Sequence, residues 1–292
     1  MPELPEVEHV VRALRVVVGR TIIASEICLP KLIAPLSVAT FNRKIKGAYI
    51  AGAFRRGKFI LIQCQKLARK RGQHTKALNR EQHFIIAVHL RMTGKFLYLN
   101  ADDELPKHSH AIFYLDNDRR LVFRDQRQFG VMKLISTAEL SRTKGISELA
   151  PEPFGDEFNF DYFKSVLKRS RRSLKTLLLD QTKVLGLGNI YAAEALFRAR
   201  ISPFKIASQL SSGRVATLHQ SIVEVLRDAI TDSSTSRINL EQPDGFSYRE
   251  AFERFWQVYE REGEPCFRCG AKIRRATHGG RSTYWCPKCQ RR

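Results

Sequence analysis

Two cysteine pairs near the C-terminal end constrain the fold of this chain more than any other feature. Cys266 and Cys269 form one C-x2-C pair, and Cys286 and Cys289 form a second pair after sixteen intervening residues. Two thiolates at this spacing can bind one tetrahedral metal ion, and two such pairs close a four-sulfur site with no open position. A segment this small buries too little apolar surface to fold alone, so metal binding would supply its folding energy. The pairs therefore predict a zinc ribbon that holds one structural Zn²⁺.

The charge balance points to a polyanionic partner. Lysine and arginine number 50 against 29 acidic residues, which gives a net charge of +21 and a pI near 10.1. Such a balance favours nucleic acid, with a membrane surface as the alternative. No apolar run approaches 18 residues, and no signal peptide is recognisable. We expect a soluble cytoplasmic protein with reduced cysteines.

The first half of the chain reads as one helix followed by many strands. Apolar residues recur at helical spacing over 7–18 and end before Gly19. From residue 21 to about 134 the pattern consists of short β-rich runs, for example 49–54, 58–62, 84–88, 111–115 and 120–123, with a hairpin tip at 116–118. Antiparallel strands at this spacing predict a sandwich or partly closed barrel packed against the first helix. The basic stretch 66–80 reads as a solvated loop that could also contact DNA.

The second half of the chain is expected to be helical. A boundary rich in proline and glycine lies at 150–155, and helices are predicted over 159–169, 173–180, 190–200, 213–230 and 248–260. Ser173 and Asn189 are candidate N-caps. The overall fold class is therefore α+β and multidomain.

The N-terminus allows two interpretations. Removal of Met1 would leave the secondary amine of Pro2, whose reference pKa of about 8 makes it a possible nucleophile near neutral pH. Glu3 and Glu6 lie beside it in the sequence as possible proton carriers. The alternative is an ordinary helix start, since proline and acidic residues are both favoured in a first turn.

Taken together, these features resemble the formamidopyrimidine-DNA glycosylase and endonuclease VIII family, and its glycosylase branch more closely. The matching motifs occur in the family's order: MPELPEVE at 1–8, RRGKF at 55–59, HLRMTG at 89–94, DQRQFG at 125–130, GLGNIYAAE at 186–194 and the closing cysteine pairs. The resemblance implies an N-terminal catalytic β-sandwich with flanking helices over 2–135, a linker over 136–155, a helix-two-turn-helix DNA-binding domain over 156–262 and a zinc ribbon over 263–292. It also implies that the chain is a monomer whose partner is double-stranded DNA with damaged bases or abasic sites.

The resemblance assigns the chemistry to four residues. Pro2 would attack C1′ of the damaged nucleotide, displace the base and form a Schiff base, after which β,δ-elimination cuts the strand. Glu3 would handle protons at the sugar, and Glu6 would fix the N-terminal turn. Lys58 would bind a phosphate beside the lesion, although the sequence alone also allows a plain surface charge.

Further positions match the family's DNA contacts. Met92, Arg127 and Phe129 correspond to the side chains that replace a flipped base in the stack, with core packing as the alternative for the two apolar residues. Lys175 and Asn189 match the family's phosphate contacts, with a solvated charge and a helix cap as their respective alternatives. Arg281 lies between the cysteine pairs, at the expected tip of the ribbon hairpin, where it could meet a phosphate or be a plain solvated charge.

The sequence departs from the family pattern at several places. Gln128 stands where the family has an arginine, Glu260 stands where it has a glycine, 65–82 looks like an insertion, and 231–247 lacks the usual lesion-closing pattern.

From the matching motifs we predict a base-excision DNA glycosylase and AP lyase that removes 8-oxoguanine and formamidopyrimidines. Two alternatives stay open at this point: the same chemistry on oxidised pyrimidines, and a non-catalytic protein that binds damaged DNA.

Overall fold

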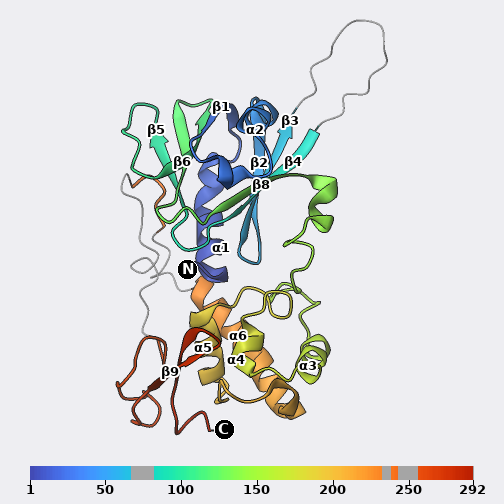
Figure 1. The fold of residues 1–292 in the computed structure, drawn as a ribbon, viewed down its shortest axis with the longest axis vertical. Coiled ribbons are helices and arrows are strands. Elements are labelled where there is room, and N and C mark those ends of the chain that lie inside the picture. Colours follow the sequence, from blue (N-terminus) through green and yellow to red (C-terminus); the bar gives the residue numbers. More distant parts are fainter. Residues whose placement is uncertain (67–81, 232–237, 243–255, 292) are drawn as a thin grey trace, which may run out of the picture. The chain divides into compact units, whose positions relative to one another are not determined.

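The computed structural model describes residues 1–66, 82–231, 238–242 and 256–291 (Figure 1). The described residues divide into two compact units. One contains 1–2, 6–66, 82–147 and 238–242, and the other contains 3–5, 148–231 and 256–291. The start of the first helix is thus shared, because Glu3, Leu4 and Pro5 pack with the second unit.

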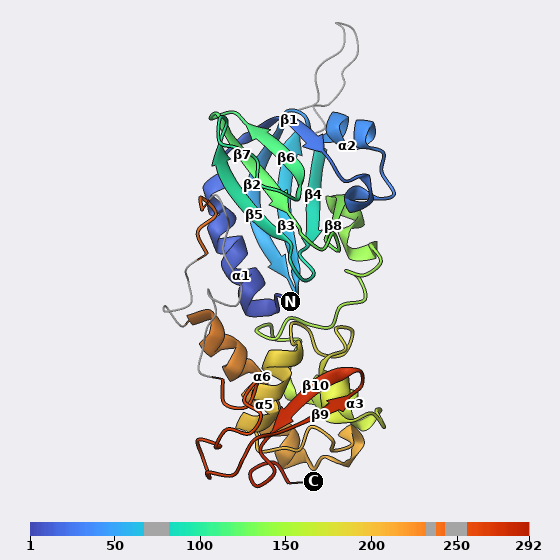
Figure 2. The same cartoon turned by 60° about the vertical axis from the view of Figure 1, so that its left-hand side comes forward.

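The first unit is built on eight antiparallel strands. They are β1 (Thr21–Ile27), β2 (Ala48–Arg56), β3 (Phe59–Lys66), β4 (Gln82–His89), β5 (Lys95–Asn100), β6 (Ser109–Leu115), β7 (Arg119–Arg124) and β8 (Val131–Ser136). Their order in the sheet is β5-β7-β6-β1-β2-β3-β4-β8. Only two residue pairs join β1 to β2, and the sheet folds at this narrow junction into the two layers of a sandwich seen in Figure 2.

The core of this unit lies between the layers and under the first helix. Alternate residues of the strands point inward, as in Ile60 and Ile62 of β3 and Phe113 of β6, and they form one buried cluster. Helix α1 (Leu4–Ala13) and the 3-10 turn η1 (Leu14–Val17) add the apolar stripe that the sequence predicts, and α1 runs beside the sheet in Figure 1. Helix α2 (Val38–Ile45), capped by Ser37, was not predicted. The two shorter 3-10 turns are η2 (Pro30–Ile33) and η3 (Thr137–Arg142).

The short segment 238–242, which follows α6 in the sequence, contributes to this core. Leu240 is buried among the residues of the sandwich, and its carbonyl accepts a hydrogen bond from Tyr98 N of β5 at 2.6 Å. Glu241 pairs with Arg119 of β7 at 2.9 Å. The edge strand β5 is therefore covered by residues that follow the helical part of the chain, which limits unwanted edge pairing.

The second unit is helical and carries a small hairpin. Its helices are α3 (Phe160–Lys168), α4 (Leu174–Leu178), α5 (Asn189–Arg198) and α6 (Ser212–Thr231), with the 3-10 turn η4 (Ala207–Gln209). Strands β9 (Arg274–His278) and β10 (Arg281–Trp285) form the hairpin, whose turn is Gly279-Gly280. The face of α5 that carries Ala193 and Phe197 packs against Cys266, Ile273 and Cys286 of the hairpin region.

Most of the predicted elements are present. The five quoted strand runs match β2, β3, β4, β6 and β7, except that residue 58 lies in the turn before β3, and 116–118 is the tip of the β6–β7 hairpin. Four of the five predicted helices match α3 to α6. For the helix expected over 248–260, residues 248–255 lie outside the described residues, and 256–260 form turns. None of the helices in the described part of the chain is long and apolar enough to span a membrane.

The expected insertion maps to one place in the sheet. Lys66 at the end of β3 pairs with Gln82 at the start of β4, so the basic stretch joins two neighbouring antiparallel strands. The Lys66 ammonium donates to the carbonyls of Arg43 and Lys44 at the end of α2, at 3.1 and 3.3 Å. A cation at this position satisfies helix carbonyls that have no partner within the helix. Residues 67–81, like 232–237 and 243–247 of the expected lesion-closing segment, lie outside the described residues.

Candidate active site and nucleic-acid interface

The carboxylate of Glu3 is held at the N-terminus of α5. Gly188 N donates to Oε2 at 2.5 Å, Ile190 N donates to Oε1 at 2.9 Å, and Tyr191 N donates to Oε2 at 3.3 Å. The side chain is only 3% exposed. Backbone N–H groups at a helix N-terminus have no partner within the helix and carry partial positive charge, so a carboxylate is favoured there. Residue 3 therefore caps a helix that begins 186 residues later in the chain.

Two glycines of the GLGN segment make room for this carboxylate and its neighbour. A methyl group on Gly188 would lie 2.4 Å from both Cδ and Oε1 of Glu3. A methyl group on Gly186 would lie 2.4 Å from Leu4 Cδ1, and Gly186 also has a φ of +89°, which disfavours other residues. Leu4 N in turn donates to Gly186 O at 3.1 Å. Glycine is therefore required at 188 for space and at 186 for both space and backbone conformation.

This arrangement corrects one expectation. Asn189 was a candidate N-cap, but it is the first residue of α5, the cap position belongs to Gly188, and no side chain of the cap residue bonds the helix. The capping acceptor comes from Glu3 instead. Ser173 does cap its helix, because its hydroxyl accepts from Thr176 N of α4.

Pro2 and Glu6 flank this anchored residue. Both are buried, and Glu6 lies in the first turn of α1, where the sequence predicted a helix start. Pro2 precedes Glu3 directly, so hydrogen bonds that fix Glu3 also restrain the backbone one residue away from the candidate nucleophile. A chain end would otherwise fray.

Lys58 lies in the tight turn between β2 and β3. Arg56 pairs with Phe59 across the turn, and Gly57 takes a φ of +57°, a conformation that glycine adopts without strain. Arg55 closes the turn by donating from Nη1 to Gly57 O at 3.2 Å. Lys58 is only 6% exposed, so it is not the freely solvated charge that was its alternative interpretation.

His89, which the sequence reasoning missed, lies close to Lys58. Burial, together with the charges of Arg91 and Lys58, lowers the pKa of His89 to about 3. Arg91 N donates to His89 Nδ1 at 3.0 Å, so the proton of the neutral ring is on Nε2. The imidazole therefore stays neutral beside the lysine and adds no repulsive charge. Its presence in the HLRMTG motif was the available signal.

The structure brings the loops of Met92, Arg127 and Phe129 together. Met92 is 42% exposed and Phe129 is 52% exposed, so the core-packing alternative is wrong for both. The guanidinium of Arg127 lies 4.9 Å from the centre of the Phe129 ring, a distance at which cation and ring attract each other. These side chains are thus presented as a small apolar and cationic surface.

A buried carboxylate joins the two loops. Asp125 hydrogen-bonds the hydroxyl of Thr93, and its other oxygen accepts from Gly130 N at 2.7 Å. Arg127 N donates to the same Thr93 hydroxyl at 3.0 Å. Gln128 takes a positive φ of 56°, which turns the chain between the two exposed side chains. The sequence reasoning did not single out Asp125, although it begins the DQRQFG motif.

Lys175, Asn189 and Arg281 gather around one residue of the β9–β10 hairpin. Lys175 Nζ donates to Ser282 O at 2.6 Å, and Asn189 Nδ2 donates to the same carbonyl at 3.0 Å. Arg281, which is exposed, directly follows the hairpin turn, as the sequence predicted. Lys175 is only 1% exposed. Lys175 is therefore not the solvated charge that was its alternative interpretation.

A third missed residue, Glu194, fixes the segment that leads into the ribbon. Glu194 of α5 is 6% exposed and accepts hydrogen bonds from the N–H groups of Gln257, Val258 and Tyr259 at 2.9 to 3.0 Å. Burial raises the pKa of Glu194, and the three backbone donors oppose that rise. An acidic residue within the apolar run of α5 was the available signal.

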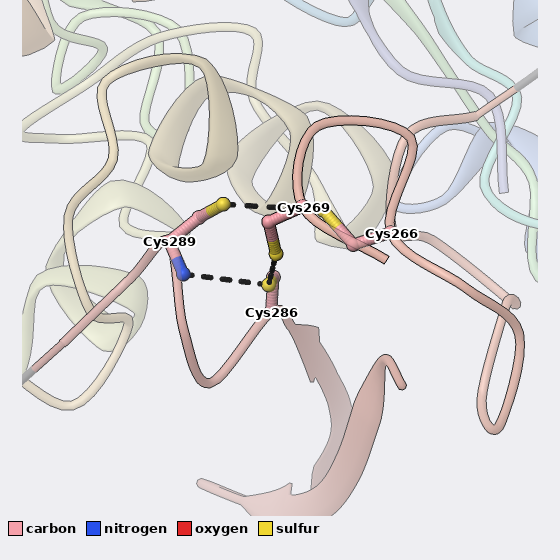
Figure 3. Close-up of side chains that lie close together, drawn as sticks. All are labelled: Cys266, Cys269, Cys286 and Cys289. Atoms are coloured by element: carbon pink, nitrogen blue, oxygen red, sulfur yellow. Dashed lines mark hydrogen bonds between the residues drawn. The ribbon is translucent and has the colours of Figure 1, made fainter. Parts of the chain in front are cut away.

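The four cysteines form one compact cluster (Figure 3). Their sulfur atoms all lie within 4.8 Å of one another, with Cys266 to Cys289 at 4.0 Å and Cys269 to Cys286 at 3.5 Å. Zinc–sulfur bonds of about 2.3 Å place the sulfurs of a tetrahedral site about 3.8 Å apart, so the set fits one zinc ion. A hydrogen bond from the Ala271 backbone is the main cause that lowers the pKa of Cys269 to about 7, whereas burial and the neighbouring thiols raise that of Cys289 to about 12. Such a set is ionised together only when a cation offsets the repulsion between the thiolates.

The described site residues thus form two groups, one in each unit. Pro2, Glu6, Lys58 and the Met92 loops belong to the sandwich unit, and Glu3, the Ser282 cluster and the cysteines belong to the helical unit. A β-sandwich, a helical part and a four-cysteine set are the features that the resemblance to a class of zinc-containing DNA glycosylases implies.

Comparisons with known proteins agree with this class. Three family models match the chain: the formamidopyrimidine-DNA glycosylase N-terminal domain over 1–132, the formamidopyrimidine-DNA glycosylase H2TH domain over 149–239, and a zinc finger found in FPG and IleRS over 263–292. The formamidopyrimidine-DNA glycosylase of Pelotomaculum thermopropionicum is 41% identical over 292 residues, which cover 100% of this chain and 99% of the relative.

Solved structures of the Lactococcus lactis Fpg are also similar. Its complex with DNA containing an oxidised pyrimidine matches with a TM-score of 0.84 and 33% identity over the full length of both chains. Its complex with FAPY-dG DNA matches with a TM-score of 0.81 and 34% identity, covering 99% of this chain and 100% of the other.

The chain belongs to the formamidopyrimidine-DNA glycosylase family. It is a base-excision repair DNA glycosylase with the AP lyase chemistry general to that family, and its cysteines hold one zinc ion. Of the alternatives left open by the sequence, the non-catalytic DNA-binding protein is therefore excluded.

Proposed function

We propose that this enzyme removes oxidised purines, 8-oxoguanine and formamidopyrimidines, from double-stranded DNA, with Pro2 as the nucleophile. The observation that carries the proposal is the Glu3 carboxylate, held by three backbone N–H groups directly beside Pro2. Chain ends are usually mobile, so an N-terminus held by hydrogen bonds at Glu3 indicates that its position matters. Catalysis requires such a fixed position, because small misplacements of a reacting group lower the rate by large factors.

The reaction follows from the chemistry of the mature N-terminus. After removal of Met1, the lone pair of the Pro2 nitrogen forms a bond to C1′, and the bond from C1′ to the base breaks as the base leaves with a proton. Glu3 gives a proton to the ring oxygen of the sugar when the C1′–O4′ bond opens, which leaves an iminium at Pro2. Two eliminations then release the phosphates on either side of the sugar, and water frees the amine. Glu6 supports the N-terminal turn.

The remaining residues grip and distort the DNA. Lys58, Asn189 and Arg281 bind phosphates, which supplies the salt-dependent part of the affinity. Met92, Arg127 and Phe129 enter the space of the extruded base. Their exposure supports this role, because a side chain that fills a base stack has to project from the protein surface. The Arg127 guanidinium adds hydrogen-bond donors for the base opposite the lesion.

The domain division proposed for these tasks is the one expected from the sequence: 2–135, a linker over 136–155, 156–262 and 263–292. The enzyme is proposed to act as a monomer in the cytoplasm on the chromosome of a bacterial cell. The complexes of the Lactococcus lactis Fpg with damaged DNA support the nature of the partner.

Borohydride trapping tests the proposal. The protein with Met1 removed is incubated with an 8-oxoguanine duplex and borohydride, and the adduct is mapped by mass spectrometry. We expect a covalent adduct on Pro2. The matched control is the same chain with Met1 retained, in which the Pro2 nitrogen is an amide without a nucleophilic lone pair and no adduct forms. Adduct formation on a lysine, or none with Met1 demonstrably absent, would refute the assignment.

Oxidised pyrimidines are the second candidate substrates. The similarity to the complex of the Lactococcus lactis Fpg with an oxidised pyrimidine favours them, as does the altered sequence at 231–247. Single-turnover rates on otherwise identical duplexes with 8-oxoguanine or thymine glycol distinguish the two. A faster reaction on thymine glycol would reverse the proposed preference while leaving the role of Pro2 intact.

A further inference from the structure

Lys175 of α4 is a buried lysine that donates hydrogen bonds to strand β10 of the zinc ribbon. Its side chain is 1% exposed, and Nζ donates to Ser282 O at 2.6 Å and to Thr283 Oγ1 at 2.7 Å. Both acceptors belong to β10, more than a hundred residues away in the sequence. A lysine rarely occupies such a position, because transfer of its charge out of water is costly unless partners compensate.

The charges of Arg281 and Glu3 both act on the ammonium group of Lys175. Desolvation lowers its pKa to about 8, the charge of Arg281 acts in the same direction, and the charge of Glu3 raises it. The ammonium thus interacts with the carboxylate at the N-terminus of α5 and with the arginine that follows the hairpin turn. Asn189 completes the connection, because its amide donates to the same Ser282 carbonyl at 3.0 Å.

The other side of the hairpin turn is fixed to the same helix. His278 Nε2 and the hydroxyl of Ser173, the residue that caps α4, share a hydrogen bond of 2.6 Å. Arg281 therefore lies between two attachment points on α4, one at His278 before the glycine turn and one at Ser282 after it. A two-stranded hairpin of five-residue strands is marginally stable by itself, so these attachments decide where its tip lies.

We propose that Lys175 is a positioning residue, which holds the β9–β10 hairpin against α4 and α5 so that Arg281 meets a DNA phosphate in register with the Glu3 carboxylate. Lys175 itself contacts no phosphate. The inference rests on the proposed roles of Glu3 and Arg281, and it replaces the phosphate contact that the sequence suggested for Lys175.

The test is a double-mutant cycle on DNA affinity, measured with a duplex that carries an uncleavable abasic-site analogue. We expect Lys175→Met and Arg281→Gln each to weaken binding about tenfold, and the double variant to bind no more weakly than either single variant. The slope of log affinity against log salt should fall by about 0.9, the value for one lost phosphate contact, in all three variants. Lys168→Met, which removes an exposed lysine from α3, is the matched control and should leave the hairpin unchanged.

Hydrogen exchange and zinc content report on the hairpin without DNA. In Lys175→Met, residues 274–285 should exchange faster while the protein retains its zinc. Thr283→Val, which removes one acceptor at nearly constant volume, should produce the same changes in exchange and affinity if Lys175→Met fails to fold. The proposal is overturned if the two substitutions are additive and the salt slope falls by about 1.8 in the double variant, since Lys175 then contacts a phosphate directly. It is also overturned if hairpin exchange is unchanged.

These outcomes are independent of the proposed nucleophile. A wild-type protein that binds the analogue duplex but gives no borohydride adduct on Pro2 would refute the proposed function and leave the positioning role of Lys175 standing. An adduct of normal yield combined with additive effects in the double-mutant cycle would support Pro2 as the nucleophile and refute the positioning role of Lys175.

Discussion

Replacement of Gly188 by alanine tests the anchoring of Glu3 most directly. The added methyl group would lie 2.4 Å from Cδ and Oε1 of Glu3 and 2.8 Å from its Cγ. Ordinary contacts between such atoms are longer than 3.4 Å, so the carboxylate has to move by about 1 Å or leave the helix N-terminus. Gly188 has a φ of −123°, which other residues can adopt, so the effect comes from space and not from backbone strain.

The expected loss of activity follows from this displacement. A misplacement of about 1 Å can cost about a hundredfold in rate, and loss of a general acid costs about 10²- to 10⁴-fold. Gly188→Ala should therefore lower the single-turnover rate of strand cleavage by at least about a hundredfold. DNA affinity should change much less, because the proposed phosphate contacts lie on other side chains.

The assay compares base release and strand cleavage on an 8-oxoguanine duplex with cleavage of a preformed abasic duplex. Gly213→Ala in α6 is the matched control, because a methyl group there meets nothing within 4 Å. It should keep full activity and gain slight stability from the better helix propensity of alanine. In the double variant Glu3→Ala/Gly188→Ala the clashing atoms are absent, so Gly188→Ala should add little to the loss of stability and activity that Glu3→Ala causes by itself. A folded Gly188→Ala protein with the wild-type rate would refute the reasoning.

Three further predictions concern the zinc site, the buried histidine and the segment that returns to the sandwich. Cys269→Ser should release zinc to a chromogenic chelator under conditions in which the wild-type protein retains it, and it should weaken DNA binding; retained zinc would contradict the four-sulfur site. Because His89 has a folded pKa of about 3 against an ordinary value of 6.5, the unfolded chain takes up the proton first as pH falls below 6.5. Stability should then fall by up to about 1.4 kcal/mol per pH unit, and His89→Phe should remove this part of the acid sensitivity in urea unfolding at pH 7 and pH 5. Leu240→Ala should destabilise the sandwich unit by about 2–5 kcal/mol in chemical unfolding, whereas Glu241→Ala, at an exposed ion pair, should cost no more than about 1 kcal/mol; equal effects would show that the segment is not anchored by its leucine.

Local patterns in the sequence were sufficient for most of the elements. The spacing of the two cysteine pairs predicted the ribbon, short β-rich runs predicted the strands of the sandwich, and the Ser173 cap marked the start of α4. These features follow from interactions between residues close in the chain, or from a ligand geometry that fixes residue spacing. The motifs in their order were likewise enough to suggest the family and its N-terminal nucleophile.

The contacts that hold the site together depend on the tertiary structure. Asn189 looked like a helix cap, but Glu3 caps that helix from the other end of the sequence. Lys175 was expected to face a phosphate or to be a solvated charge, but it lies buried against the ribbon. Asp125 joins two loops whose connection no local pattern reveals. A hydrogen bond between distant residues leaves no periodicity and no fixed spacing in the sequence. The sequence by itself therefore determined which residues and modules this enzyme carries, and only the folded chain decided which groups those residues meet.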